Sequence, residues 1–232
     1  MSTRKSSLVL LLILIAGLLA AGCSNSNNDN VVNATSDASI EFVHASSQTP
    51  AIDILIDSVP WESDLYYPHH TVYTDIAPGT HNVVVRLSGT SAPDYIDTNI
   101  TFGDNLFYSL YVTDTIGSLK FVVMPDELSR PDSNYVHVRL VNLVPDKGPV
   151  TIFTFPGDSL FASMTGVDYK HYTSPVQINM GTYSLQVRNQ SGDPLTSSNQ
   201  PFDFTSGSNY TLMLIVPPGP GSGVVLDTIV TK

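Results

Sequence analysis

A β-rich fold is indicated first by the stretch APGTHNVVVRL at residues 77–87. A Pro-Gly turn signal comes directly before a run of β-branched residues, an order that is typical of a strand entered from a tight turn. The pattern returns 102 residues later as GTYSLQVR at residues 181–188. In both stretches five residues separate the Gly-Thr pair from an arginine. The chain is therefore expected to contain two copies of one strand-rich unit.

Further matches extend this repeat on both sides. Residues matching at a separation of 102 are Tyr67 and Tyr169, His69 and His171, Thr71 and Thr173, Phe102 and Phe204, Tyr108 and Tyr210, and Leu110 and Leu212. Residues matching at a separation of 98 are Val43 and Val141, Ile52 and Val150, and Ile54 and Ile152. Four extra residues in the second copy, between Ile152 and Tyr169, account for the two separations. Each copy spans about 90–100 residues, which is enough for one independent core.

The local pattern within each copy is strand and turn. Residues 40–44 alternate between apolar and polar, as do 52–56 and 183–187. The first of these runs places His44 on the face of its apolar residues, so we expect a hydrogen-bonded core histidine there. No convincing 3.6-residue apolar period follows Cys23. We therefore predict an all-β fold of two tandem antiparallel β-sandwich modules, residues 37–126 and 134–232, with a short polar joint that contains Pro125 and Pro131.

The N-terminal segment has the order of a secretory signal. Arg4 and Lys5 precede an apolar stretch from residue 8 to 19, which is too short for a membrane-spanning helix, and Gly22-Cys23 follows. This order resembles a bacterial lipoprotein signal of residues 1–22, after which Cys23 carries acyl chains such as palmitate. The alternative is an ordinary signal peptide with a chance cysteine. Since Cys23 is the one cysteine of the chain, it is better explained as a lipid attachment site than as a disulfide partner.

Two further expectations depend on that cleavage. In the bacterial sorting pattern that this signal resembles, a residue other than Asp after the cysteine, here Ser24, indicates the outer membrane. Residues 23–36, with SNSNNDN near their start, lack the apolar side chains needed to fold and are expected to form a flexible tether.

The net charge of the mature chain limits the kinds of partner that it can bind. Removing Arg4 and Lys5 with the first 22 residues leaves 8 basic against 21 acidic side chains, a formal charge of −13. An acidic surface repels phosphate backbones, so nucleic acid is excluded as a partner. It also repels anionic lipid, so the acyl chains have to supply the membrane attachment.

The first copy opens with VHASSQTPAIDI at residues 43–54 and continues with APGT at residues 77–80. These motifs resemble the tandem domain of unknown function 4397 of bacterial secreted proteins and lipoproteins, which has V-H-A-S-P-D-A-P-x-V-D-V followed by A-G-x-Y. The first copy departs from the pattern at residues 47–49 and at His81, and the second has Asn142-Leu143 in place of His-Ala. The resemblance implies sandwiches of immunoglobulin or transthyretin type, without an established activity and without catalytic residues.

Candidates for hydrolysis are few. No Gly-x-Ser-x-Gly elbow occurs, and Gly-Ser-Gly at residues 221–223 is better interpreted as a turn. Asp94 and Asp97 are the nearest pair of carboxylates for glycoside hydrolysis, but loop and edge positions explain them more simply. Asp53 and Asp57 lie on the side of a strand opposite its isoleucines, so they are expected to face solvent. We predict no catalytic residue.

Metal sites are also weakly indicated. His69, His70 and His81 would supply imidazoles to zinc or copper, yet adjacent histidines on a strand point to opposite faces. Asp104 and Asp114 would be loop ligands for calcium, but no D-x-D-x-D-G loop is present. We predict no metal ligand and no cofactor.

The best candidate for ligand binding is the segment WESDLYYPHHTVY at residues 61–73. Trp61, Tyr66, Tyr67 and Tyr73 offer aromatic faces beside carboxylates, the combination that sugars and peptides use. The second copy retains Tyr169, His171 and Tyr172, so a structural role in every module is the alternative.

Together these features predict a lipid-anchored lipoprotein of the cell envelope that acts as a non-enzymatic module for binding, adhesion or envelope assembly. Its expected partners are the membrane, through the N-terminal acyl chains, and an envelope protein or glycan. The alternative is a carbohydrate-active accessory protein or hydrolase with a cleft between the two modules.

Overall fold

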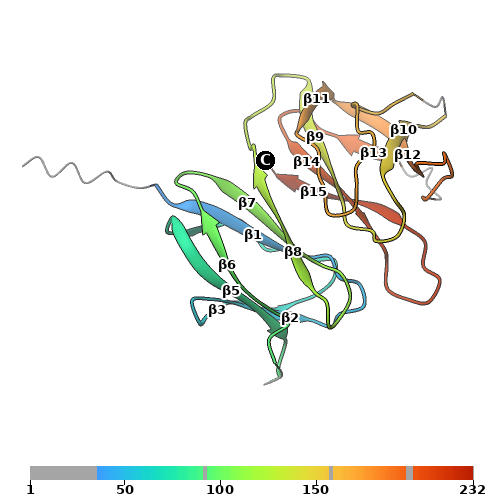
Figure 1. Cartoon of the computed structure of the whole chain (residues 1–232). Coiled ribbons are helices and arrows are strands. Elements are labelled where there is room, and N and C mark those ends of the chain that lie inside the picture. Colours follow the sequence, from blue (N-terminus) through green and yellow to red (C-terminus); the bar gives the residue numbers. More distant parts are fainter. Residues whose placement is uncertain (1–35, 91–92, 157–158, 197–200, 232) are drawn as a thin grey trace, which may run out of the picture. The chain divides into compact units, whose positions relative to one another are not determined.

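The computed structural model describes residues 36–90, 93–156, 159–196 and 201–231. Every regular element in these ranges is a β-strand, which confirms the predicted all-β class (Figure 1). A search of the same ranges for a helix long and apolar enough to cross a membrane found none.

The first module, called module 1, consists of two four-stranded sheets. Its strands are β1 (Ala38–His44), β2 (Ile52–Ile56), β3 (Val59–Leu65), β4 (Thr74–Ile76), β5 (Gly79–Leu87), β6 (Ile96–Phe102), β7 (Phe107–Thr113) and β8 (Lys120–Asp126). One sheet has the order β4-β1-β7-β8 and the other the order β3-β2-β5-β6. Strands β6 and β8 are therefore edge strands of different sheets.

The second module, called module 2, repeats this arrangement. Its strands are β9 (Tyr135–Asn142), β10 (Val150–Thr154), β11 (Val176–Asn179), β12 (Gly181–Asn189), β13 (Pro201–Phe204), β14 (Asn209–Ile215) and β15 (Val225–Thr231). They form sheets of order β11-β9-β14-β15 and β10-β12-β13. Among the described residues of module 2, no strand corresponds to β3. The segment in its place makes single bridges from Val150 to Val167 and from Phe153 to Leu160, within the region of the four extra residues.

One pair of strands in each module departs from the predicted antiparallel pairing. β1 lies parallel to β7, and β9 lies parallel to β14, whereas the other paired strands are antiparallel. The chain leaves β1, forms β4 and the whole opposite sheet, and returns as β7 in the same direction. Such a parallel pair requires a long connection, which β2 to β6 supply here.

Each module encloses a core between its two sheets because alternate residues of each strand point inward. In module 1, Ile52, Ile54 and Ile56 of β2 are buried against Ile40 and Phe42 of β1. Module 2 has an equivalent core. Its fully buried members include Leu140, Ile152, Leu185 and Leu212. Two sheets with one apolar layer between them are the sandwich that the alternating pattern predicts.

The duplication extends to individual hydrogen bonds. In each module a threonine hydroxyl accepts a bond from a backbone amide of the first strand, and a tyrosine hydroxyl accepts one from a turn amide. The equivalent bonds are Phe42 N to Thr71 Oγ1 (3.0 Å) and Leu140 N to Thr173 Oγ1 (3.0 Å), and Gly103 N to Tyr108 Oη (3.0 Å) and Thr205 N to Tyr210 Oη (2.8 Å). The predicted matches of Thr71 with Thr173 and of Tyr108 with Tyr210 are therefore structural equivalences.

A third apolar cluster joins the two modules. It is formed by outward-facing residues of β1, β7 and β8 together with those of β9, β14 and β15. Its buried members are Val43, Ala45, Tyr111, Val122, Met124, Val141, Leu143, Met213, Ile215 and Ile229. We call the contributing surface of each module its pairing face. Since these side chains are at most 8% exposed, the outer surface of one sheet in each module is buried as deeply as a core.

Candidate functional site

The four aromatic residues proposed for ligand binding do not form one exposed face. Trp61 lies on β3 and packs partly buried against the core of module 1. Tyr66 is 58% exposed. Tyr67 and Tyr73 instead direct their hydroxyl groups into hydrogen bonds within the protein. Tyr66 is thus the one exposed residue of the four, since Trp61, Tyr67 and Tyr73 are half-buried.

Tyr67 and its equivalent Tyr169 both reach across to the other module. Tyr67 donates to the carbonyl oxygen of Val216 at 3.0 Å, and Tyr169 donates to the carboxylate of Asp114. Burial, together with the charge of Asp227, raises the pKa of Tyr67 to about 12. Both hydroxyl groups therefore stay protonated at neutral pH and act as donors that hold the modules together.

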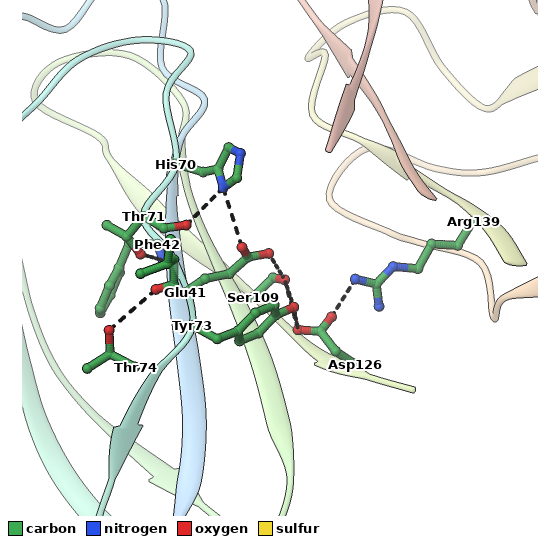
Figure 2. A network of polar contacts seen from close by, with 10 residues as sticks. Glu41, Phe42, His70, Thr71, Tyr73, Thr74, Ser109, Asp126 and Arg139 are labelled. Atoms are coloured by element: carbon green, nitrogen blue, oxygen red, sulfur yellow. Dashed lines mark hydrogen bonds and ion pairs between the residues drawn. The ribbon is translucent and has the colours of Figure 1, made fainter. Parts of the chain in front are cut away.

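Tyr73 belongs to a buried polar network at the pairing face (Figure 2). Its hydroxyl donates to Asp126 Oδ2 at 2.6 Å. Ser109 Oγ lies 2.7 Å from Glu41 Oε1 and 2.8 Å from Asp126 Oδ2. Arg139 of module 2 completes the network, because its Nη2 lies 2.5 Å from Asp126 Oδ1 and its Nε donates to Thr211 Oγ1 at 2.9 Å.

Burial makes this network electrostatically important. The side chains of Asp126 and Arg139 are 0% and 7% exposed. Burial raises the pKa of Asp126, and the attraction of Arg139 opposes that shift only in part. Burial alone would lower the pKa of Arg139, but Asp126 together with the hydroxyl groups of Tyr111 and Tyr73 leaves that pKa raised. Removing one partner of an ion pair at this depth costs stability, because the other charge then stays buried without a counter-ion.

The number of hydrogens available limits which hydrogen bonds of the network form at the same time. A serine hydroxyl has one hydrogen, so Ser109 donates to Glu41 or to Asp126, but not to both at once. The other carboxyl group then receives no hydrogen from Ser109. His70 lies 3.5 Å from Glu41 Oε2, at the exposed end of the network. Its pKa is raised, chiefly by the interaction with Glu41.

His44 is the hydrogen-bonded core histidine that the alternating pattern predicts. It is fully buried, and its Nδ1 accepts a bond from the amide of Ser46 at 3.3 Å. Its Nε2 must therefore carry the hydrogen and donate to the carbonyl oxygen of Pro50 at 3.1 Å. Burial lowers the pKa of His44.

In module 2 the same place is taken by Asn142, which suggests a test. Asn142 repeats the first bond, since its Oδ1 accepts from the amide of Val144, the equivalent of Ser46, at 3.1 Å, while its Nδ2 donates to a different carbonyl oxygen, that of Val167, at 2.9 Å. A histidine whose folded pKa is lowered stabilises the fold above its unfolded pKa, near 6.5, and that stability is lost as pH falls. We expect His44→Asn to flatten the decline in melting temperature between about pH 7.5 and pH 5.

Circular dichroism melts of the wild type and of His44→Asn at both pH values measure this effect. The exposed variant His171→Asn is the matched control and should keep the wild-type slope. An unchanged slope in His44→Asn would contradict the assignment, because some other group would then carry the pH dependence.

The carboxylates considered for hydrolysis are held apart by separate partners. Asp94 pairs with Arg86 at 3.1 Å, and Asp97 accepts a bond from Asn82 at 2.7 Å. Asp57 is exposed, as predicted, and accepts bonds from Asn82 N at 2.9 Å and from His81 at 2.6 Å. Asp53 is half-buried and accepts from the amide of Asp64 at 3.0 Å. These contacts give each carboxylate a role in its turn or strand edge.

The histidines and aspartates weighed as metal ligands are likewise dispersed. His70 contacts Glu41, whereas His81 contacts Asp57 and the carbonyl oxygen of Ala77 at 2.8 Å. Asp114 binds Lys170 at 2.5 Å. Within the described ranges no group of three or more His, Cys, Asp or Glu side chains is arranged to hold a metal ion.

The open edges of module 1 border a groove that the sequence did not indicate. It has a volume of about 630 Å³ and runs between β6 and β8. Its apolar lining includes half-buried Ile100, Phe121 and Val123, and its rim carries exposed Thr98 and Lys120. Since β6 pairs only with β5 and β8 only with β7, both strands present one unpaired edge toward this groove.

The predicted lipid attachment site, Cys23, lies outside the described residues, as does nearly all of the predicted tether. Sequence reasoning also missed the buried network of Glu41, Asp126 and Arg139. One signal was present: Glu41 and Arg139 are 98 residues apart, the separation that relates the starts of the two copies. A charged residue at the same strand position in both copies marks a place where burial requires a partner.

Comparisons with known proteins give one family match and no match to a curated protein. The family model described as "Domain of unknown function (DUF4397)" matches residues 38–153 and 137–228. A search of curated protein sequences found no match.

Several solved β-rich structures show a distant likeness. The C-terminal domain of AlgF from P. aeruginosa is 16% identical, with 43% of this chain and 98% of that chain covered and a TM-score of 0.30. CBMbc (family CBM26) from Eubacterium rectale Amy13K, solved with maltoheptaose, is 13% identical over 84% of this chain and 96% of that chain, with a TM-score of 0.25. A Bacteroides uniformis protein provisionally described as a cell adhesion protein is 12% identical over 84% and 97%, with a TM-score of 0.26.

Proposed function

The chain belongs to the family of the domain of unknown function DUF4397, and from this premise we propose that it is a lipid-anchored, non-enzymatic binding module of the bacterial cell envelope. The observation that carries the proposal is the contrast between its two kinds of surface. The acidic and basic side chains at the pairing faces are engaged with one another, whereas the groove between β6 and β8 keeps unpaired strand edges and apolar side chains accessible.

The groove favours an extended protein segment over a sugar. An unpaired strand edge offers backbone N–H and C=O groups that an added strand satisfies, while an apolar floor receives its alternate side chains. Sugar stacking requires exposed, flat aromatic faces, and the aromatic side chains of the groove, Tyr95 and Phe121, are half-buried in the core of module 1. The proposed ligand is therefore an extended segment of another envelope protein.

The alternative of a hydrolase with a cleft between the modules has less support. The pairing faces are filled by the third apolar cluster, and the cavity between them, lined by Ala45, Thr113, Leu143 and Val216, measures about 100 Å³. The two carboxylates that converge nearby, Glu41 and Asp126, have side chains 4% and 0% exposed. A substrate would have to open the buried network to reach them.

A lysine placed at the rim of the groove tests the proposal. We expect Thr98→Lys to reduce binding of the partner by about tenfold or more, which corresponds to about 1.4 kcal/mol, because a lysine on an edge strand opposes strand addition. Thr98 is exposed, so melting temperature should hardly change. The matched control is Thr74→Lys, an exposed threonine on edge strand β4 of the other sheet.

A photo-crosslinking residue at position 98 or 74 of the full-length lipoprotein, activated in intact cells, identifies the partner, and titration of that partner against Thr98→Lys and Thr74→Lys measures the loss of binding. The expected result is one protein partner captured from position 98 and not from position 74, with the crosslinked peptide in an extended stretch. Equal capture from both positions, or capture of glycan alone, would remove the groove from the proposal.

A further inference from the structure

Contacts between the modules come in symmetry-equivalent pairs. Tyr67 of module 1 bonds residue 216 of module 2, and Tyr169 of module 2 bonds residue 114 of module 1. Positions 67 and 169, and positions 114 and 216, are equivalent at the repeat separation of 102 residues. When residue i meets j and j meets i, the contact is isologous, as in a two-fold symmetric dimer.

The apolar cluster has the same symmetry. It contains the equivalent pairs Val43 and Val141, Ala45 and Leu143, and Tyr111 and Met213. Met124 and Ile229 form a further pair, since Met124 lies opposite Ser109 and Ile229 lies opposite the equivalent Thr211. The cavity of about 100 Å³ is lined by Ala45 and Leu143, by Ser47 and Pro145, and by Asp114 and Val216. Each of these is an equivalent pair, which places the cavity on the local two-fold axis.

Charge breaks this symmetry at two pairs of equivalent positions within the buried network. Glu41 and Arg139 are equivalent, and each bonds the hydroxyl group at the paired position of the parallel neighbouring strand, Ser109 or Thr211. Asp126 faces Arg139 across the interface. The strand register makes Thr231 the equivalent of Asp126, since Asp126 lies opposite Phe107 and Thr231 lies opposite Asn209. Module 1 therefore contributes two buried carboxylates and module 2 one buried guanidinium.

We infer that the pairing face is a recognition surface for a second module of this fold, and that Glu41, Asp126 and Arg139 select an unlike module. Two copies of module 1 would bring Asp126 of each against Glu41 of the other, and buried like charges repel. Two copies of module 2 would bury two copies of Arg139 without a carboxylate. Only the unlike pair matches an acid with a base, so the partner is the complementary module of the same chain or of a second copy.

Cutting the chain between the modules tests the inference without removing either one. A protease site placed within residues 127–133 of the full mature chain separates β8 from β9 covalently. After cleavage we expect both halves to elute together in gel filtration at micromolar concentration. Wild-type halves that elute separately would overturn the inference.

Selection of the unlike module is tested by exchange. Isotope-labelled and unlabelled cleaved chains are mixed and their complexes weighed by native mass spectrometry. The expected mixed species contain one module 1 and one module 2, and a substantial population of like pairs would refute the charge selection. This measurement uses the wild-type sequence of both modules and needs no variant to fold.

Two variants add a quantitative test. Arg139→Glu copies the charge of module 1 onto module 2 and should weaken association of the cleaved halves at least about 100-fold. Arg139→Lys keeps the charge and should stay within about tenfold of the wild type. If Arg139→Glu associates as tightly as Arg139→Lys, charge does not select the partner.

Discussion

Replacing Arg139 with methionine is expected to lower the free energy of unfolding by about 3–5 kcal/mol. The substitution keeps much of the side-chain volume but leaves Asp126 buried without its counter-ion. Tyr73 still donates a hydrogen bond to Asp126, and Ser109 Oγ lies within hydrogen-bond distance of it, so the carboxylate keeps a partner. Urea denaturation followed by circular dichroism at about pH 7.5 measures the change.

The pH dependence of this loss has a defined sign. Burial already raises the pKa of Asp126 above its unfolded value. A carboxyl group with a raised folded pKa stabilises the fold below its unfolded pKa, and that stability is lost as pH rises through the folded pKa. Removing Arg139 raises the pKa further, so the deficit of Arg139→Met should be largest at neutral pH and shrink toward about pH 4.

The double variant Asp126→Leu, Arg139→Met is the control for this prediction. Replacing both charges by apolar side chains should recover most of the stability, because the ion pair must offset a large desolvation cost. A double variant that is no more stable than Arg139→Met would show that the charges are not the source of the loss.

Cys23→Ser is expected to move nearly all of the protein from the membrane fraction to the soluble fraction. Each buried CH₂ group of an acyl chain contributes about 0.8 kcal/mol to membrane binding, and several chains give durable attachment. The net charge of −13 expected for the mature chain supplies no attraction to anionic lipid, so electrostatic attraction does not replace the acyl chains. Cell fractionation with immunoblotting measures the redistribution, and the mass of the mature N-terminal peptide reports the acyl chains.

Ser24→Asp is the matched control at the neighbouring position. It leaves the thiol intact, so the protein should remain membrane-bound, while the bacterial sorting pattern predicts retention in the inner membrane. Membrane association that survives Cys23→Ser would instead support the ordinary signal peptide with a chance cysteine, and would require another mode of attachment.

Periodicity was sufficient to predict the parts of the fold that depend on local sequence. Alternation at residues 40–44 placed His44 in a core, and the matches at 98 and 102 residues identified two equivalent modules whose hydrogen bonds agree. The Pro-Gly turn signal at residues 78–79 located one strand, and the matching Gly-Thr pair at residues 181–182 located its equivalent 102 residues later. At both glycines φ is strongly positive, 132° and 142°, a backbone conformation that favours glycine.

These patterns could not predict which strands that are distant in the sequence pair with each other. The parallel partnership of β1 with β7 depends on where the chain returns after five intervening strands, and alternation is the same for parallel and antiparallel neighbours. The role of Tyr73 was missed for a related reason. An aromatic residue next to carboxylates in sequence resembles a sugar site, whereas its actual carboxylate partner, Asp126, lies 53 residues away.

The pairing faces also limit how many modules a chain of this kind accommodates. Each module has one such surface, and pairing covers both, so two modules make a closed unit to which a third cannot attach in the same way. A longer relative built from these modules should therefore occur in even numbers, or else expose one apolar surface for association with another chain. Engineered arrays with two or four modules should therefore be more soluble than an array with three.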